Sequence, residues 1–568
     1  MMKFKNPTHQ TLLQWHWQDF APYYDDLLAG ELNAANLDDW MAAWTDVAAA
    51  ADELFNRLYV ATSVNTVDEA AEQGFKDFME NTYPSLMEKS QLLKEKLLAS
   101  GLTPEGFEIP MRNMRAEAAL FCKENIPLEV ELNQLSVELD KILGAQTVQW
   151  EGEERTARQM EVVLRDKERA KRQAGWELSF NRQLADRQAI NDNWVKMFKL
   201  RIQVAKNAKK PSYREYVWES YKRFDYTPDD CKRFHAAIEQ VVVPAVNRLS
   251  EKRKQALGVE GLRYFDLFVA LDDYPPLQPF SDAAELEEKA ATVFSQVGAQ
   301  FGAYFESMRR EGLLDLANRK NKADGAYTTD YAMIKRPFIF GNAVGIHDDV
   351  QTLVHEGGHA FHAFETFNLP YIQQRWTPME FNEVASMAME NLIMPYLTAD
   401  KGGFYSERDA ARAIISHLED TLRFWPYMAI VDAFQHWAYE NPEGGMDPAA
   451  CDAQWAALED RFRPYLDWSG YEEIKKTGWH RKHHIHQVPF YYIEYGVAQL
   501  GAGQVWLNAL QDQAAAVEMY HNALKLGGTV TLPQLYQTAG AKLAFDAATL
   551  GKVVDTMEAK IAEMEAKL

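Results

Sequence analysis

Residues 355–359 have the sequence His-Glu-Gly-Gly-His. On an α-helix, positions i and i+4 lie on one face, so His355 and His359 could bind a single metal ion. Neutral imidazole is a favoured ligand of zinc. Glu356 would point to a neighbouring side, where it could take a proton from a water held by the metal. The pattern therefore predicts a zinc centre that activates water for hydrolysis.

A catalytic zinc needs a third protein ligand and leaves one position for water. Residues 378–392 follow a helical pattern and contain the glutamates Glu380, Glu383 and Glu390. Glu383 and Glu390 are seven residues apart and share a face, and Glu380 comes one turn before Glu383. Spacing alone leaves the choice among the three open.

The helix predicted to carry His355 and His359 also contains two glycines and a third histidine. Gly357 and Gly358 each cost about 1 kcal/mol relative to alanine in a helix interior. We therefore expect another chain segment or the substrate to approach the backbone closely there. His362 shares the face of His355 and His359 and is an alternative ligand, although packing or support of the site is its expected role.

A segment near the C-terminal side gathers four of the 14 histidines within seven residues and adds three tyrosines: His480, His483, His484, His486, Tyr491, Tyr492 and Tyr495. A neutral phenol or imidazole beside the scissile carbonyl can donate to the oxyanion, which is worth about 2.7–4 kcal/mol per donor. The alternative is that any single aromatic residue here belongs to the core. For the segment as a whole we expect a polar, functional wall.

The surrounding chain is patterned mainly as helices. Apolar residues recur at three- and four-residue spacing over residues 37–100, with Thr66 and Glu69 as a predicted capping box and Gly101 as a predicted helix stop. Helical spacing returns over 193–208. Residues 147–156 break the pattern with β-prone residues around a Glu-Gly pair, which predicts a hairpin.

A second break precedes the histidine motif. Residues 325–345 are bounded by glycines and rich in Tyr, Ile and Phe, which predicts one or two strands. Asp348 and Asp349 then suit the start of a helix. A strand should thus lead into the helix that carries the chemistry.

Composition limits the classes of function. With 568 residues, the chain should form about two to four lobes. A net charge of −23 argues against nucleic-acid and anionic-membrane partners. The three cysteines form no CxxC pair, and we find no apolar run suited to a signal peptide or a membrane span, so we expect a cytoplasmic protein.

Three motifs together resemble the thimet oligopeptidase and oligoendopeptidase F family of zinc metallopeptidases, and within it the oligoendopeptidase F branch. They are PFIFGNAVGIHDDVQTLVHEGGHAFH, FNEVASMAMENL and HIHQVPFYYIEYGVAQ. Weaker similarity extends over residues 201–218 and 522–541. The resemblance covers roughly the last two thirds of the chain, and the combination is far more specific than the five-residue motif alone.

The resemblance implies that His355, His359 and Glu383 bind one zinc ion per chain and that Glu356 is the general base. It implies that residues 337–342 lie near an edge strand against which the peptide backbone docks, and the predicted substrate-binding residues are Phe338, Ile339, Phe340, Gly341 and Asn342. It also brings a histidine and tyrosines over the scissile carbonyl. His484, preferred to His486, and Tyr491, Tyr492 and Tyr495 are the candidates.

The implied fold is mostly α: an elongated, two-lobed helical body with a deep substrate channel and a small β-sheet beside the zinc helix. We expect an N-terminal helical lobe over 1–195 and a catalytic domain over 196–568. The expected function is cleavage of internal bonds in short oligopeptides, by a monomer or a small homo-oligomer. The alternatives are a zinc carboxypeptidase on a related scaffold and an inactive peptide-binding protein.

Overall fold

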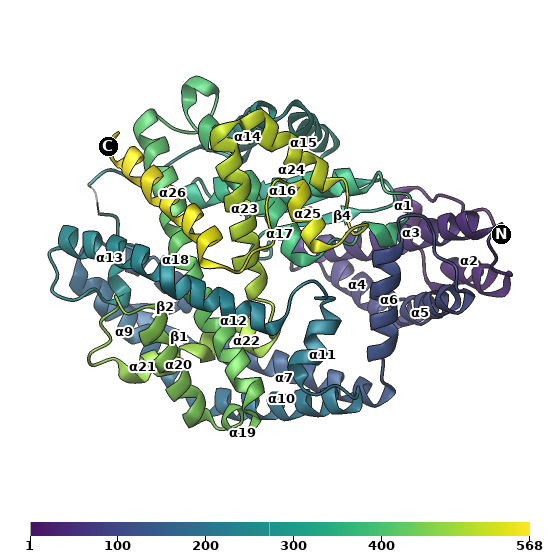
Figure 1. The fold of residues 1–568 in the computed structure, drawn as a ribbon, viewed down its shortest axis with the longest axis horizontal. Coiled ribbons are helices and arrows are strands. Elements are labelled where there is room, and N and C mark those ends of the chain that lie inside the picture. The colour runs from purple at the N-terminus through teal and green to yellow at the C-terminus, as the bar shows by residue number, and fades with distance from the viewer. Residues whose placement is uncertain (1, 272) are drawn as a thin grey trace.

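The computed structural model describes residues 2–271 and 273–568. The chain is mostly helical, as expected, and its N-terminal helices form the group drawn in purple at the right of Figure 1. These helices are α1 (His9–Leu12), α2 (Trp17–Ala29), α3 (Leu37–Val64), α4 (Glu69–Asn81), α5 (Tyr83–Ser100) and α6 (Glu108–Leu120), whereas α7 (Ile126–Gly144) lies apart from them in the lower middle of the view. In the described part of the chain, no helix combines the length and apolarity needed to cross a membrane.

The remaining helices form the larger body. Those before the histidine motif are α8 (Ala157–Met160), α9 (Arg169–Ala185), α10 (Arg187–Asn207), α11 (Tyr213–Ser220), α12 (Pro228–Ala237), α13 (Val243–Leu257), α14 (Ala283–Val297) and α15 (Ala299–Glu311). The motif lies in α16 (His347–Thr366), which is followed by α17 (Met379–Leu392), α18 (Glu407–Glu440), α19 (Pro442–Gly445), α20 (Pro448–Phe462), α21 (Glu472–Lys476), α22 (His483–His486), α23 (Ile493–Gln511), α24 (Gln513–Leu524), α25 (Leu532–Thr538) and α26 (Ala547–Glu565).

The predicted hairpin at 147–156 is confirmed. Strands β1 (Thr147–Trp150) and β2 (Glu153–Thr156) pair antiparallel. Glu151 and Gly152 join them with φ angles of 52° and 85°. Positive φ at both central residues is the backbone of a tight two-residue turn whose twist matches the strands.

The predicted strands before the histidine motif form part of a three-stranded sheet. Its strands are β3 (Leu314–Ala317), β4 (Tyr327–Tyr331) and β5 (Arg336–Ala343), in the order β3-β5-β4. β3 runs parallel and β4 antiparallel to β5. The central strand β5 leads directly into α16, so the sheet fixes where the helix of the histidine motif begins.

Two of the three helix ends that were predicted from the sequence are confirmed. Gly101 ends α5 with φ 70°, and the Asp349 carboxylate accepts from the backbone N–H groups of Val344, Gly345 and Ile346 at the start of α16. The predicted capping box at Thr66 is wrong. Asp68 caps α4 instead, because its carboxylate reaches the N–H groups of the next turn.

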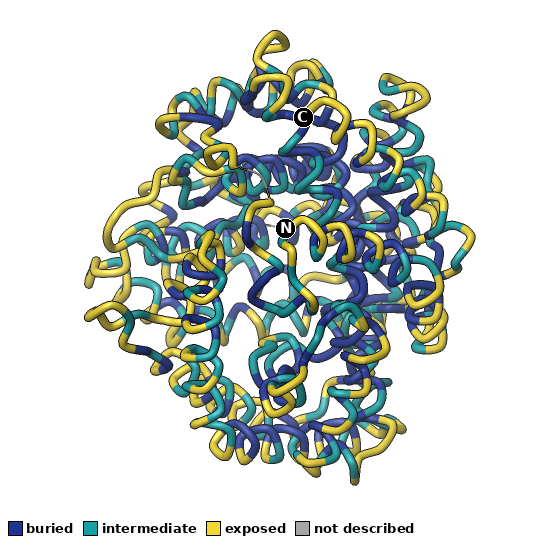
Figure 2. The backbone as a smooth tube through the Cα atoms, turned by 90° about the vertical axis from the view of Figure 1, so that its left-hand side faces the viewer, coloured by how far each residue is buried: buried dark blue, intermediate teal, exposed yellow. Residues whose placement is uncertain are grey.

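Two large hydrophobic clusters account for most of the buried side chains. One gathers residues of 12–114 together with Tyr371, and the other extends from Val60 and Trp194 to Met564 and includes α16 and α17. Buried segments run through the interior in Figure 2, while exposed segments lie at the periphery. A lobe boundary near residue 195 stays a prediction.

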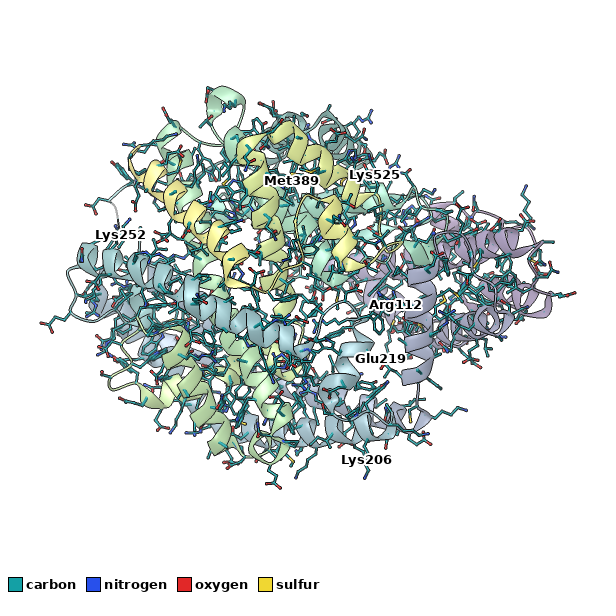
Figure 3. The ribbon with its side chains drawn as sticks, viewed as in Figure 1. Arg112, Lys206, Glu219, Lys252, Met389 and Lys525 are labelled. Atoms are coloured by element: carbon teal, nitrogen blue, oxygen red, sulfur yellow. The ribbon has the colours of Figure 1, made fainter. Side chains whose placement is uncertain are left out.

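The two motif glycines lie where helices touch. A Cβ on Gly358 would lie 2.6 Å from the Ala385 carbonyl oxygen and from Ser386 Cα on α17. A Cβ on Gly357 would lie 2.7 Å from Phe294 Cζ on α14. The expected close approach of another segment is therefore confirmed. The contact lets α17 pack closely against α16. Met389, labelled in Figure 3, marks the position of α17 within the helical body.

Candidate active site

The packing of α16 against α17 brings three side chains of metal-binding type together. Glu383 Oε2 lies 3.4 Å from His355 Nε2 and 3.8 Å from His359 Nε2. One donor atom from each of the three lies within 4.8 Å of the other two. The imidazole rings are 4.9 Å apart between centroids. The three donors converge from two helices on one point.

This donor set fits a zinc ion. Two imidazole nitrogens and one carboxylate oxygen are a common catalytic zinc set, and ligands about 2.0–2.2 Å from a tetrahedral zinc lie roughly 3.3–3.6 Å from one another. The separation of 3.4 Å between Glu383 and His355 falls in that range, and that of 3.8 Å between Glu383 and His359 is slightly longer. Burial lowers the pKa of His359 to about 4, so this imidazole is neutral at neutral pH, which is the form that binds a metal.

The other two glutamates have different partners. Glu380 accepts a hydrogen bond of 2.6 Å from Tyr226 and lies 3.4 Å from Arg223. Glu390 accepts a hydrogen bond of 2.7 Å from Nδ1 of His355, the nitrogen on the far side of the ring from Glu383. Sequence reasoning did not anticipate that second role for Glu390. It fixes the ring orientation and the tautomer of His355.

His362 does not join the donor set. Its side chain is buried, and its Nε2 lies 3.3 Å from the Thr377 hydroxyl. The ring also packs edge-on against Phe381. These contacts fit the expected packing role.

Glu356 lies beside the donors and faces the sheet. Its side chain is buried, and Oε2 accepts a 2.7 Å hydrogen bond from the Thr328 hydroxyl on β4. Burial raises the pKa of Glu356 above its usual value, and the charge of His355 opposes that shift. A carboxylate with a raised pKa is suited to accept and return a proton near neutral pH. A lone threonine carries no pattern that could have revealed Thr328 in advance.

Two cavities open beside these residues. One of about 280 Å³ is lined by Glu356 together with Gly341, Asn342 and Asp349. The other, of about 420 Å³, is lined by a larger set that includes Asp52, Thr328, Asp330, His359, Glu383 and Tyr491. Glu356 thus borders the smaller cavity, and His359 and Glu383 border the larger one.

The five predicted substrate-binding residues lie on β5, beside the edge of the sheet, and their contact with substrate stays a prediction. Residues 336–340 of β5 pair with β4, and Ile339, Phe340 and Ala343 pair with β3. Phe338 is buried in the core. Ile339, Phe340, Gly341 and Asn342 line the smaller cavity. The edge strand next to them is β4, whose residues 328–330 line the larger cavity.

The histidine and tyrosine segment divides into two groups. The rings of His484 and Tyr491 are 5.9 Å apart, those of His484 and Tyr495 6.1 Å, and those of Tyr491 and Tyr495 5.5 Å. Burial raises the pKa of Tyr495 to about 12, and the charge of Glu383 adds to this shift. The Tyr495 phenol therefore keeps its proton and can donate it. Tyr491 lines the same cavity as His359 and Glu383.

The other members of the segment face the core. Tyr492 is buried against Phe424 and Tyr427. His486 is fully buried and lies 3.2 Å from the backbone carbonyl of Trp479. His480 is buried and bonded to Asn191. The geometry thus favours His484 over His486. Tyr492 is more buried than Tyr491 and Tyr495, but its ring also lies 4.8 Å from that of His484 and 5.7 Å from that of Tyr495.

Comparison with known proteins gives consistent results. The family model described as Peptidase family M3 matches residues 162–554. An oligoendopeptidase F homologue of Lactococcus lactis subsp. lactis is 27% identical over 183 residues, which is 32% of this chain and 29% of that protein. Oligopeptidase PepF of Bacillus subtilis is 25% identical over 336 residues, 57% of this chain and 47% of that protein.

Similarity to solved structures extends over nearly the whole chain. The structure of PZ peptidase A with an inhibitor superimposes with a TM-score of 0.83 at 25% identity and covers 99% of this chain and 98% of that one. By contrast, the chain spans about half the length or less of the curated relatives it matches.

Proposed function

The chain belongs to peptidase family M3, and on that premise we propose that it is a zinc-dependent endopeptidase that hydrolyses internal bonds of short oligopeptides. The observation that carries the proposal is the convergence of His355, His359 and Glu383, with Glu356 beside them. Two relatives whose names include oligoendopeptidase or oligopeptidase support the same substrate class.

His355, His359 and Glu383 would hold the metal, one ion at this site. Zinc supplies Lewis acidity there, which polarises the scissile carbonyl and lowers the pKa of the attacking water towards 7. Glu356 takes a proton from that water and later returns it to the leaving amine. Thr328 holds the carboxylate in place, because its hydroxyl donates to the Glu356 oxygen at 2.7 Å.

The phenols of Tyr491 and Tyr495 would stabilise the oxyanion that forms on the scissile carbonyl. Both lie beside His484, and Tyr491 opens into the cavity that holds His359 and Glu383. Donors fixed before the reaction stabilise developing charge without reorganisation at the moment of attack. His484 would position the two phenols or donate directly.

An extended peptide would lie along β4. The free edge of this strand can make main-chain hydrogen bonds that tolerate many sequences. Its residues 328–330 line the cavity of about 420 Å³, where a few residues of an extended peptide would lie. The three cysteines are unpaired, in keeping with the predicted cytoplasmic location.

The Glu356→Gln variant tests this function. It keeps the size of the side chain and the hydrogen bond from Thr328 but cannot take up the proton, so we expect kcat/KM to fall about 100- to 10,000-fold with zinc still bound. The assay uses an internally quenched peptide that is acetylated and amidated at its ends. Retained turnover by the variant would rule out Glu356 as the general base.

The same peptide separates the proposed activity from the carboxypeptidase alternative. An amidated C-terminus blocks stepwise removal of residues, whereas an endopeptidase still cuts inside. Mass spectrometry of the products should show two internal fragments. Loss of single C-terminal residues from a free peptide, with no cleavage of the blocked one, would favour the carboxypeptidase.

A further inference from the structure

A second group of metal-binding side chains lies between α12 and α18. Cys231 and His235 are four residues apart on α12, and Asp432 and His436 are four residues apart on α18. Residues at this spacing share one helix face, as the two histidines of α16 do. The two pairs face each other. Asp432 Oδ2 lies 2.8 Å from His235 Nε2 and 3.3 Å from His436 Nε2.

Three of these residues have the arrangement of a ligand set. One donor atom each from Cys231, Asp432 and His436 lies within 4.8 Å of the other two, which is also true of His355, His359 and Glu383. All three side chains are buried, with 0%, 0% and 2% exposure. Among the described residues, Asp432 Oδ1 has no hydrogen-bond partner, and His436 Nε2 has none beyond its 3.3 Å ion-pair contact with Asp432 Oδ2. Buried polar atoms are normally paired by hydrogen bonds, so these two atoms require an explanation.

The charge of the group also lacks compensation. A buried carboxylate is costly unless it is paired. Among residues 2–271 and 273–568, the ion-pair partners of Asp432 are the two imidazoles, and neither arginine nor lysine is among them. A divalent cation would supply the missing charge and use the free oxygen and nitrogen.

We propose that Cys231, Asp432 and His436 bind a second zinc ion, which has a structural role. Thiolate, carboxylate and imidazole are all zinc ligands, and the thiol favours zinc over magnesium or calcium. His235 is a positioning residue, because its ring holds the other oxygen of Asp432. A buried water would complete the four ligands. Binding releases the thiol proton, so thiolate and carboxylate balance the two charges of the ion.

The competing arrangement is a metal-free network with a proton on His436 Nε2. One contact favours it: Arg214 Nη1 lies 3.5 Å from His436 Nδ1. Arg214 also pairs with Glu215 and Glu440, and its contact to the imidazole is at the distance limit for a hydrogen bond. The two arrangements differ in metal content and in whether sulfur binds the metal.

Cobalt substitution distinguishes them in the full-length protein. A cobalt ion bound by a thiolate shows a near-ultraviolet sulfur-to-metal charge-transfer band, and His355, His359 and Glu383 offer no sulfur. We expect the band in the cobalt-loaded wild type and in the His359→Ala variant, whose cleft site is impaired. Cys231→Ser should abolish it. Cys451→Ser is the matched control: Cys451 is buried on α20, its thiol bonded to backbone carbonyls, and its removal should leave the band intact.

Metal analysis gives the second readout. The zinc-loaded wild type should contain two zinc ions per chain, and Cys231→Ser and His359→Ala one each. Absence of the charge-transfer band from the wild type, or one zinc in the wild type and in Cys231→Ser alike, would overturn the proposal. If Cys231→Ser does not fold, zinc-edge X-ray absorption of the wild type decides, because a sulfur neighbour at the zinc supports the second site and its absence refutes it. Neither result depends on peptidase activity.

Discussion

Two pairs of helices in this chain bring histidine and carboxylate donors together, and the two places differ in their access to water. On α16 and α17, the side chains of His355, His359 and Glu383 are 26%, 23% and 11% exposed, and His359 and Glu383 border a cavity. On α12 and α18, Asp432 and its partners are buried in the core. This difference in exposure fits the proposed hydrolysis at the first place and the proposed structural role at the second.

Within the C-terminal histidine segment, residues only a few positions apart also divide between the cleft and the core. His484 shares ring contacts with Tyr491 and Tyr495 near the cleft. His486, two residues later, is buried between Trp194 and Trp479. Residue type and local spacing are nearly identical for the two histidines. What separates them is the face of a short helix, which decides whether a polar group meets substrate or core.

The largest expected effect is on stability and tests the core side of the comparison. His436→Ala leaves the buried Asp432 carboxylate with one imidazole, so we expect the free energy of unfolding to fall by about 3–5 kcal/mol. His359→Ala, on the cleft side, should cost less than about 1 kcal/mol in the metal-free protein. Urea denaturation followed by tryptophan fluorescence measures both. Equal losses would remove the distinction between cleft and core.

The second effect concerns catalysis and tests the cleft side. Tyr491→Phe and Tyr495→Phe each remove a donor near the metal ligands, so we expect kcat to fall about 100- to 1,000-fold with KM little changed. Tyr492→Phe is the matched control, because its ring packs against Phe424 and Tyr427. A larger loss in Tyr492→Phe than in the other two variants would reverse the assignment.

Local patterns predicted much of what positions the site. The helix of His355 and His359, the hairpin at 147–156 and the strands before α16 follow from periodicity and turn residues within about 20 positions. The close approach of another segment at Gly357 and Gly358 was also predicted, because glycine in a helix interior is costly and therefore needs a structural reason. Each of these features depends on the chain segment that contains it.

Features that depend on distant segments were not accessible in this way. Helical spacing left open which of Glu380, Glu383 and Glu390 is the third ligand. The answer depends on how α17 is turned relative to α16, and on Arg223 far upstream, which pairs with Glu380. The pairing of β3 with β5, which makes β5 a central strand, comes from a separate segment. The meeting of α12 with α18 joins residues about 200 positions apart. The capping box predicted at Thr66 was wrong for a local reason, because Asp68 caps α4 instead.

The third effect is smaller and concerns orientation of a ligand. Glu390→Gln weakens the hold on His355 Nδ1, so we expect zinc affinity or kcat/KM to fall about 10- to 100-fold. The chain offers a control on α16, the helix that carries His355: Glu365 lies 2.6 Å from His521 Nε2, away from the donor set. Glu365→Gln should change zinc affinity little. Equal losses in the two variants would show that Glu390 acts only through stability.

The smallest effect compares carboxylates of the two environments by their pH dependence. In the core, His436 and His235 hold the pKa of Asp432 well below its usual range even though burial opposes them. In the cleft, enclosure by the surrounding protein and the neighbouring Asp330 raise the pKa of Asp52 to about 7, although its side chain is exposed to solvent. The folded state therefore binds a proton at Asp52 that the unfolded chain has already lost above about pH 4.

Stability should consequently fall as pH rises from about 4 to 7, and the penalty is complete above pH 7. Asp52→Asn removes this dependence and should stabilise the protein at pH 8 relative to wild type. Because the side chain stands in a cavity open to water, the gain should stay under about 1 kcal/mol. Urea midpoints of the two proteins between pH 4 and 8 measure the difference. If Asp52→Asn were less stable than wild type at pH 8, the carboxylate would be paired there and the cleft would resemble the core.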